Sequence, residues 1–298
     1  MKIIDKTRIA NKLITTDTPT QLIFFTDLDD TLLDARDYGF EPARSIMGEL
    51  EARNIPLILL TSKSAAEVFA LRDAMGNRHP FGTENGSVIF IPQGYFNAVG
   101  VEKPAAATDY EIRRVGLDYE TICAMLHQLR DQKGYQFRGF SDMSVAEVIE
   151  ITGLTQVQAQ EAKQRESTEA ILWQDSTENL REFEIWLKSQ ELTLLSGGRF
   201  LHVMPAQADK ALAMNFLMQS YRSMFPDKIW KTIAFGDGGN DLRMLEAADV
   251  GIVVPHVNGY HIQVQNPCRI ECDEIASHGW VKAAEWILGL TTGAHKNG

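Results

Sequence analysis

Three aspartates close together at the end of an apolar run are the first residues in this sequence that could do chemistry. Residues 24–34 read FFTDLDDTLLD, so Asp27, Asp29 and Asp30 follow a run that is suited to a buried strand. Carboxylates this close repel one another, and burial disfavours their charged forms. A hard divalent cation relieves both costs, because Mg²⁺ prefers carboxylate and carbonyl oxygens as ligands. A carboxylate held there can also act as a nucleophile.

A second acidic loop has the same relation to an apolar run. Residues 236–241 read GDGGND and follow a run that ends at Phe235. If the two loops lie at neighbouring strand ends, Asp237 joins the first aspartates at one metal site. Asn240 and Asp241 either support that site or orient the loop, for example as a helix cap.

Other strand-end residues have the properties needed to hold a phosphate. Thr61 ends a third apolar run, and Lys63 and the helix start at Ser64 follow it. Hydroxyls, lysines and the free N–H groups of a helix start all bind phosphate oxygens. Lys210 adds a cation at the start of a later helix, although Asp209 beside it is an alternative partner. Lys63 is equally well explained as a solvated surface lysine.

These residues need a scaffold that brings several strand ends together. Continuous short apolar runs are typical of strands buried on both faces, as in a parallel sheet. They alternate with amphipathic helical patterns, which predicts an α/β fold with a doubly wound, Rossmann-like parallel sheet. Ligands of such sheets bind at the carboxyl ends of the strands. The predicted strands are 22–26, 56–60, 232–235 and 250–254, and the predicted helices are 42–54, 64–75, 210–224 and 241–248.

The α/β pattern is interrupted by a long stretch with its own mixture of helices and strands. We interpret this stretch as an inserted α/β cap domain, placed to act as a lid or a specificity element above the site. The predicted division is a polar N-terminal extension at 1–18, a catalytic core at 19–94 and 207–290, the cap at 95–206 and a tail at 291–298.

Composition excludes some classes of function. The chain has 298 residues, 23% of them charged, and a net charge of −11, which argues against nucleic-acid binding. No apolar run reaches the length of a membrane span or a signal peptide, so we expect a cytoplasmic protein without membrane contacts. Cys268 and Cys272 could form a zinc site with His261 and His278, but we favour ordinary thiols for these and for Cys123.

The motifs now support a family resemblance. DLDDT at 27–31, Thr61, Lys210 and GDGGND at 236–241 resemble, in order, the four motifs of the haloacid dehalogenase-like phosphatases, over residues 20 to 290. The resemblance implies that Asp27 is the nucleophile, that Asp29 is the general acid and base, and that Thr61 and Lys210 hold the phosphoryl group. It implies a Mg²⁺ cofactor bound by Asp27, the backbone carbonyl of Asp29 and Asp237, with Asn240 and Asp241 in support. The family often has glycine at the position of Asp30, so Asp30 receives no role.

Local stretches narrow the resemblance. Residues 61–64, 84–86, 164–169 and 197–202 are similar to the mannosyl-3-phosphoglycerate phosphatase family. Its substrate carries a phosphate, a carboxylate and a hexose, and arginines match carboxylates with two hydrogen bonds. The residues expected to bind this small phosphorylated sugar-glycerate are Lys63, Asn85, Arg165, Ser167, Glu169, Arg199 and His202.

Several alternatives stay open from sequence. A glucosyl-3-phosphoglycerate preference differs by only one epimeric hydroxyl, and another sugar phosphate is a further possibility. A sensor that binds phosphorylated ligands without turnover is a hypothesis of another class. A glycosyltransferase with a DxD metal site is disfavoured by the GDGGND motif.

Overall fold

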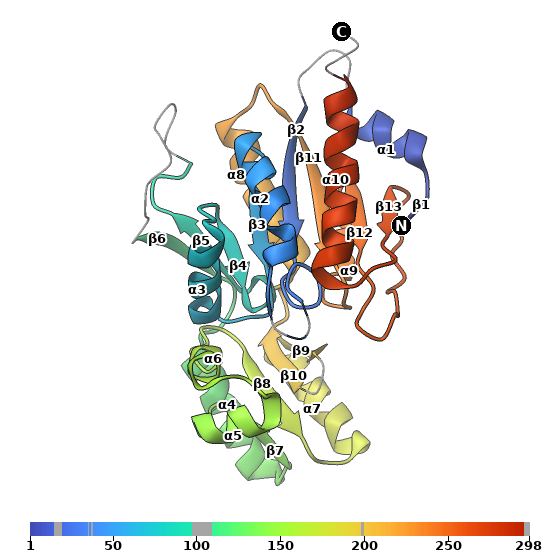
Figure 1. Ribbon diagram of the computed structural model, residues 1–298. Helices are drawn as coiled ribbons and strands as arrows, with labels where there is room; N and C mark the ends of the chain where they lie inside the picture. Colours follow the sequence, from blue (N-terminus) through green and yellow to red (C-terminus); the bar gives the residue numbers. More distant parts are fainter. Residues whose placement is uncertain (15–19, 35, 37, 97–108, 198–199, 295–298) are drawn as a thin grey trace.

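Two sheets organise the chain, one in each of two α/β domains (Figure 1). The computed structural model describes residues 1–14, 20–34, 36, 38–96, 109–197 and 200–294. In these residues the larger sheet has nine strands and forms the core domain. Their spatial order is β1 (Lys2–Ile3), β13 (Arg269–Glu271), β12 (Val250–Val253), β11 (Ile229–Gly236), β2 (Thr20–Thr26), β3 (Leu57–Leu60), β4 (Phe81–Thr83), β5 (Val88–Pro92) and β6 (Tyr110–Arg114).

The six strands from β13 to β4 are parallel and buried between helices. Alternate residues of β2 enter opposite layers: Phe24 packs in one cluster and Phe25 in the other. Helices on both faces of a parallel sheet confirm the predicted doubly wound α/β fold. One layer contains α1 (Lys6–Leu13), α2 (Arg44–Ala52), α3 (Ala65–Met75) and α10 (Ala276–Ala294); the other contains α8 (Lys210–Met224) and α9 (Leu242–Ala247); η1 (Glu41–Ala43) and η2 (Glu84–Gly86) are short 3₁₀ turns.

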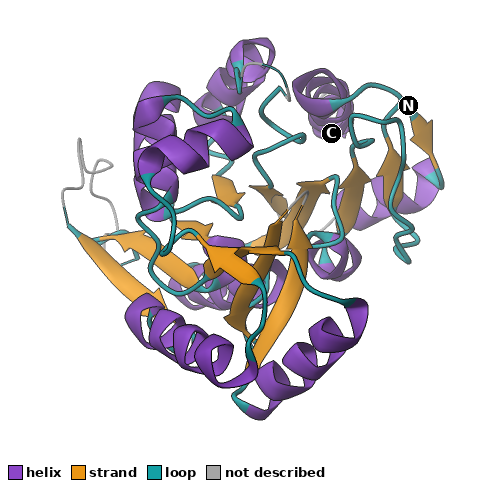
Figure 2. Cartoon of the chain, turned by 90° about the horizontal axis from the view of Figure 1, so that it is seen from below, coloured by secondary structure: helices purple, strands orange, loops and turns teal. Residues whose placement is uncertain are grey.

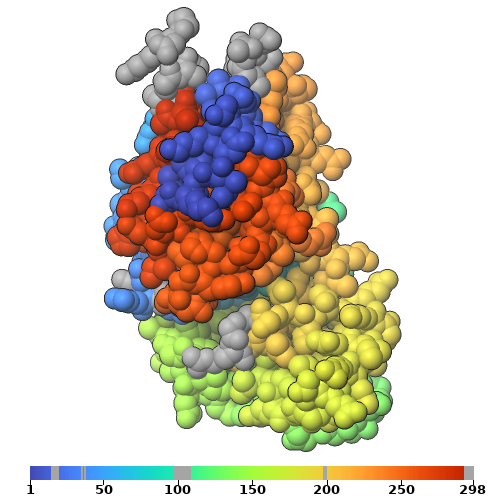
Figure 3. Space-filling view, turned by 90° about the vertical axis from the view of Figure 1, so that its right-hand side faces the viewer, coloured from blue at the N-terminus to red at the C-terminus, as the bar shows by residue number. Residues whose placement is uncertain are grey.

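The smaller sheet belongs to the cap and is antiparallel throughout. Its order is β7 (Phe137–Gly139), β8 (Glu169–Trp173), β10 (Phe200–Pro205) and β9 (Leu192–Gly197). Residues of α4 (Tyr119–Lys133) and α7 (Thr177–Ser189) pack in one cap cluster, and residues of α5 (Val145–Thr152) and α6 (Gln156–Ala162) pack in another. The central core strands point toward the cap (Figure 1), and the cap forms the lower part of the molecule in Figure 3. Seen from below, it lies across the ends of those strands (Figure 2).

The observed elements differ from the predicted domain boundaries at three places. Ile3 pairs with Ile270 in the sheet, and Ile9 and Leu13 are buried, so the N-terminal segment packs on the core. Ile9 and Leu13 lie four residues apart on one face of α1, a stripe that its polar neighbours obscured. Strand β6 lies in the range predicted for the cap, but it pairs with β5 at the edge of the core sheet. Its exposed, charged residues are typical of a sheet edge. Helix α10 also runs four residues into the predicted tail.

No helix in the described ranges has the length and apolar character that crossing a membrane requires.

Candidate active site

The first aspartate is held by the last step of a strand ladder. The Asp27 N–H donates to the Phe235 carbonyl at 3.0 Å, which continues the pairing of β2 with β11 beyond Thr26. The Thr26 hydroxyl donates to the Asp27 carbonyl at 2.7 Å and accepts from the Trp280 indole N–H at 3.2 Å. Only 5% of Asp27 is exposed. Parallel pairing of these two strands therefore places Asp27 beside the loop that begins with Asp237.

The second acidic loop needs a glycine at its start. A Cβ atom on Gly236 would lie 2.4 Å from the Asp241 Cβ, so no larger residue fits without a shift. Asp241 turns back under the loop, where one carboxylate oxygen accepts the N–H groups of Asp237 and Gly238 at 3.1 and 3.0 Å. It makes no side-chain cap bond to α9, so Asp241 orients the loop through these backbone N–H groups and not as a helix cap.

Lys210 connects the two acidic loops from below. Its ammonium lies 2.7 Å from an Asp27 oxygen and 2.6 Å from an Asp241 oxygen, and the side chain is fully buried. Burial opposes its charge, but the carboxylates of Asp241 and Asp27 outweigh burial and raise the pKa of Lys210 above its usual value. Asp209 instead caps α8 and pairs with Arg243, so it is not the partner of Lys210.

The three buried aspartates carry more negative charge than Lys210 can balance. Oxygens of Asp27, Asp237 and Asp241 lie within 4.8 Å of one another. Burial and then the Asp241 charge raise the pKa of Asp27 to about 7, and burial, Asp241 and Asp27 raise the pKa of Asp237 to about 8. Three ionised carboxylates and one ammonium leave two negative charges, which a divalent cation would neutralise. The donor set therefore fits a hard divalent metal ion.

One hydroxyl that sequence reasoning missed orients the Asp237 carboxylate. The Thr31 hydroxyl donates to an Asp237 oxygen at 3.1 Å, across 206 positions of sequence. Thr31 is fully buried beneath the first acidic loop. In the sequence Thr31 is only the last residue of DLDDT, and nothing there indicates that its hydroxyl would contact Asp237.

Asp29 lies further out than Asp27 and pairs with a different lysine. Its side chain is 37% exposed, and its oxygen lies 2.9 Å from the Lys63 ammonium. Lys63 also lies 3.5 Å from Glu67 and over the Tyr38 ring. Thr61 is fully buried; its hydroxyl accepts the Lys63 N–H at 3.2 Å. Thr61 and Lys63 are thus linked to each other and, through Lys63, to Asp29.

A cavity of about 830 Å³ opens above these residues, between the core and the cap. On the core side it is lined by Asp27, Asp29, Asp30, Tyr38, Ser62, Asn85, residues 237–240 and the loop residues His256, Val257, Asn258, Tyr260 and Ile262; on the cap side by Thr152, Leu195, Ser196, Phe200 and His202. Asn240 donates to the Asn85 side-chain oxygen at 3.1 Å across the cavity floor. Burial and then the charge of Arg165 lower the pKa of His202 to about 3, so its imidazole is neutral at pH 7.

Of the other predicted cap residues, Arg165 and Ser167 lie at the junction between the domains, and Glu169 lies within the cap. The Arg165 guanidinium donates to the Thr168 hydroxyl at 2.6 Å and to the Ser62 carbonyl at 3.2 Å. Ser167 donates to the Leu117 carbonyl at 2.7 Å, and Glu169 accepts from the Ser141 hydroxyl at 2.7 Å. All three side chains are therefore engaged by protein groups, and none lines the cavity above the aspartates.

A buried glutamate of the core holds this junction. Glu84 has no exposed surface, yet its carboxylate accepts the N–H groups of Glu166 and Ser167 at 2.7 and 3.1 Å and the Thr168 hydroxyl at 2.7 Å. Arg165 lies 3.8 Å away and supplies the balancing charge. Sequence reasoning included Glu84 only in the stretch 84–86 that carries the family resemblance and gave it no role, because charged side chains are rarely fully buried.

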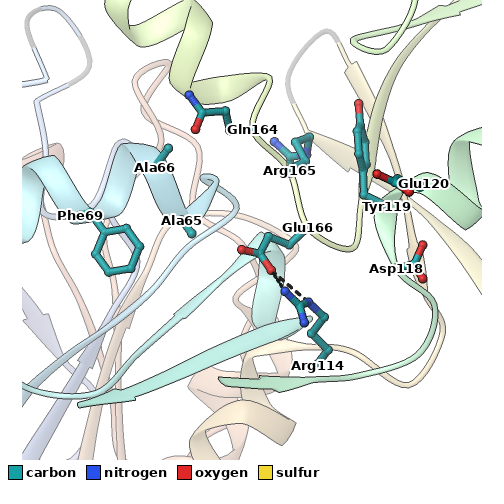
Figure 4. Close-up of a pocket in the computed structure, with 10 residues that line it drawn as sticks. All are labelled: Ala65, Ala66, Phe69, Arg114, Asp118, Tyr119, Glu120, Gln164, Arg165 and Glu166. Atoms are coloured by element: carbon teal, nitrogen blue, oxygen red, sulfur yellow. Dashed lines mark hydrogen bonds and ion pairs between the residues drawn. The ribbon is translucent and has the colours of Figure 1, made fainter. Parts of the chain in front are cut away.

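A second cavity, of about 580 Å³, lies beside the junction, between α3 and the cap (Figure 4). It is lined by Ala65, Ala66, Phe69, Arg114, Asp118, Tyr119, Glu120, Gln164, Arg165 and Glu166. Glu166 accepts from the Arg114 Nε at 2.9 Å, an ion pair between the edge strand β6 and the cap that is drawn in Figure 4. No aspartate of the two acidic loops lines it, so this cavity is separate from the acidic site.

Two further predictions concern arginine and cysteine. Arg199 lies outside the described residues. Cys268 and Cys272 are buried free thiols, and the groups of possible metal ligands found in the described residues contain aspartates and a histidine but no cysteine. The structure therefore gives no support to the zinc alternative.

Parallel strands with two aspartate loops, a buried lysine and an inserted cap define a class of enzyme. The chain belongs to the haloacid dehalogenase-like hydrolases, whose family model matches residues 24–259, and it is a phosphoric monoester hydrolase. It is 31% identical over 269 residues to a glucosyl-3-phosphoglycerate/mannosyl-3-phosphoglycerate phosphatase of Persephonella marina, an alignment covering 90% of this chain and 97% of the relative.

Solved structures show the same fold at much lower sequence identity. A haloacid dehalogenase superfamily phosphatase of Bacteroides thetaiotaomicron is 15% identical with a TM-score of 0.64, covering 94% of this chain and 99% of that one. A subclass IIB sugar phosphatase is 17% identical with a TM-score of 0.59, covering 91% and 100%. At these identities the likeness shows the shared fold of core and cap.

Proposed function

We propose that this protein is a Mg²⁺-dependent phosphatase that hydrolyses 2-O-(α-D-mannosyl)-3-phosphoglycerate to mannosylglycerate and phosphate. The observation that carries the proposal is the full-length similarity to a relative named for this reaction. That relative is also named for the glucosyl compound, so we include glucosyl-3-phosphoglycerate as the nearest alternative substrate. A place in the cytoplasmic synthesis of mannosylglycerate, a compatible solute, belongs to the same proposal.

The proposed reaction has two steps that use Asp27 and Asp29. An Asp27 oxygen attacks phosphorus, the bond from phosphorus to the glycerate oxygen breaks, and Asp29 gives its proton to the departing oxygen. Asp29 then takes a proton from water, which attacks the phosphoaspartate and releases phosphate from Asp27. The contact between Lys210 and Asp27 keeps a positive charge at the reacting oxygens throughout both steps.

We assign the metal site to Asp27, the Asp29 carbonyl and Asp237, with Asn240 and Asp241 in support. A bound Mg²⁺ would neutralise the phosphate oxygens and the aspartates that now repel one another. Asp241 contributes by holding Lys210 and the N–H groups of the loop rather than by reaching the cavity. Thr61 and Lys210 are proposed to hold the phosphoryl group, since both lie directly beside the strand ends that carry Asp27 and Asp29.

The remaining predicted contacts divide by location. Lys63, Asn85 and His202 are proposed to contact the substrate, Lys63 because it pairs with Asp29, which lines the cavity. Arg199 is retained as a carboxylate partner on the strength of its charge alone. Substrate contacts from Arg165, Ser167 and Glu169 require these side chains to leave their present partners, which are protein groups.

Phosphate release from a panel of esters tests the proposal. The panel contains both hexosyl-3-phosphoglycerates, 3-phosphoglycerate, glycerol 3-phosphate and hexose 6-phosphates, each with Mg²⁺ and with EDTA. We expect the highest kcat/KM for a hexosyl-3-phosphoglycerate, no activity in EDTA, and recovery when Mg²⁺ is restored. A higher kcat/KM for a hexose 6-phosphate would contradict the substrate assignment, and full activity in EDTA would contradict the metal assignment.

A further inference from the structure

The catalytic cavity has a second wall whose residues no step of the proposed reaction uses. A volume of about 830 Å³ is in the range of pockets that enclose whole small molecules, so it holds much more than a phosphoryl group. One wall is the core loop between β12 and β13, with His256, Val257, Asn258 and Tyr260. This loop belongs to the catalytic domain rather than to the cap.

Hydrogen bonds within the loop fix its shape. The His256 N–H donates to the Tyr260 carbonyl at 2.9 Å, and the Gly259 N–H donates to the His256 carbonyl at 2.7 Å. The Asn258 side chain accepts the Tyr260 N–H at 2.9 Å, and Gly259 has a φ of +78°, a value that glycine adopts readily. A closed turn of this kind holds its side chains in place before a ligand arrives.

The side chains that this turn presents are suited to a sugar. Tyr260 is 59% exposed and Val257 52% exposed, although both line a cavity between two domains. A phenol ring offers a flat apolar face with a polar tip, which matches the apolar C–H face and the hydroxyls of a hexose. Single exposed apolar residues are common on protein surfaces. Here Val257 and Tyr260 lie on one hydrogen-bonded turn that lines the catalytic cavity.

The charge on this side of the cavity selects against an anion. Asp30 has a left-handed φ of +54°, and its carboxylate lies 3.8 Å from the His256 Nε2. Oxygens of Asp30 and Asp237 and a nitrogen of His256 lie within 4.8 Å of one another. A carboxylate of the substrate would be repelled by Asp30, whereas neutral hydroxyls can donate hydrogen bonds to it. The glycerate carboxylate is then expected on the opposite side, toward Lys63.

We propose that Asp30 and the core loop 256–260 form a subsite for a neutral hexose, with Tyr260 as its stacking surface. The proposal rests on the phosphatase function proposed above. It assigns selection of the sugar in part to the catalytic domain, so that the cap's His202 and Ser196 face the sugar from the other side. In this subsite Asp30 accepts hydrogen bonds from the hydroxyls of the sugar, which is a role separate from the proposed metal site.

The test is the ratio of kcat/KM for a hexosyl-3-phosphoglycerate to that for 3-phosphoglycerate, which lacks the hexose. We expect Tyr260→Ala to lower this ratio about tenfold, equivalent to about 1.4 kcal/mol, mainly through KM. Tyr260→Phe keeps the ring and should stay within about threefold of the original protein. Asp30→Gly suits the left-handed backbone and should also lower the ratio, with the Mg²⁺ concentration for half activation measured as its control.

The outcomes separate the subsite from the proposed function. If Tyr260→Ala and Asp30→Gly lower kcat/KM equally for both substrates, the ratio stays unchanged. That result would overturn the subsite while leaving the phosphatase assignment intact. If the original protein hydrolyses neither hexosyl-3-phosphoglycerate, the proposed function fails. The same variants are then compared on a hexose 6-phosphate and glycerol 3-phosphate, and an unchanged ratio there would overturn the subsite as well.

Discussion

Replacing Asp27 by asparagine should make the metal-free protein more stable while removing its activity. Burial and the neighbouring Asp241 raise the pKa of Asp27 from 3.8 to about 7, so ionising this carboxyl costs more in the folded state than in the unfolded state. A shift of about three units at about 1.4 kcal/mol per unit gives at most about 4 kcal/mol. The asparagine side chain of the variant carries no charge, so this cost is absent from its folded state.

The sign of the effect fixes its pH dependence. Because the folded pKa is raised, the wild-type carboxyl is protonated in both states well below pH 3.8, and the wild-type protein loses stability as pH rises from there toward about 7. The stability difference between Asp27→Asn and wild type should therefore be small at about pH 4, grow through about pH 5 and 6, and level off above about pH 7. For a chain of 298 residues the plateau corresponds to roughly 6 °C in Tm.

The assay is thermal unfolding in EDTA between about pH 4 and 8, repeated with Mg²⁺. In Mg²⁺ the stability advantage of the variant should shrink or reverse, because Mg²⁺ at the proposed site would stabilise the wild-type protein and the variant lacks one of its proposed ligands. Asp29→Asn is the matched control, since Asp29 is more exposed and pairs with Lys63. A variant that is less stable than wild type at the alkaline end of this range in EDTA, or a difference that does not change with pH, would refute the reasoning.

Three further substitutions test the surrounding structure. Lys210→Met leaves the buried carboxylates of Asp27 and Asp241 without their cation. It should lower the free energy of unfolding in denaturant by about 3–5 kcal/mol and abolish phosphate release. An unchanged free energy of unfolding would contradict the buried ion pairs. Gly236→Ala forces a Cβ against Asp241, so it should lower the free energy of unfolding by about 1–3 kcal/mol and weaken activation by Mg²⁺. Unchanged activation would show that the loop adapts to the added methyl group. Glu84→Gln puts an amide where N–H groups converge, so it should lower the free energy of unfolding by about 1–3 kcal/mol and raise KM. An unchanged free energy of unfolding by calorimetry would contradict the role of Glu84 in holding the junction.

The sequence was sufficient to predict the core because burial and chemistry agree there. Apolar runs followed by Asp27, Thr61 or Asp237 are typical of parallel strands that end at a site, and pairing of β2 with β11 brings the two acidic loops together. The buried Lys210 follows from the charge of those loops. These features depend on spacing along the chain, which sequence records directly.

Features that depend on packing across distant segments were not predictable in the same way. Arg165 and Ser167 resemble substrate ligands in sequence, but the side chains contact junction groups whose positions come from the folded cap. Glu84 acquires its role from N–H groups 82 and 83 residues away. Tyr260 lies in a loop without a hydrophobic period, so its place in the cavity follows only from the closed turn that carries it.

The most direct test of the central claim is to locate the phosphoryl group during turnover. Rapid acid quenching of the original protein during turnover with Mg²⁺ and a hexosyl-3-phosphoglycerate should trap the phosphoaspartate that forms in the first proposed step. After quenching and borohydride reduction, peptide mass spectrometry is expected to find the modified residue at position 27, and the sample without Mg²⁺ is expected to lack it. Turnover by Asp27→Asn, or a phosphoryl group on any other residue, would contradict the proposed mechanism.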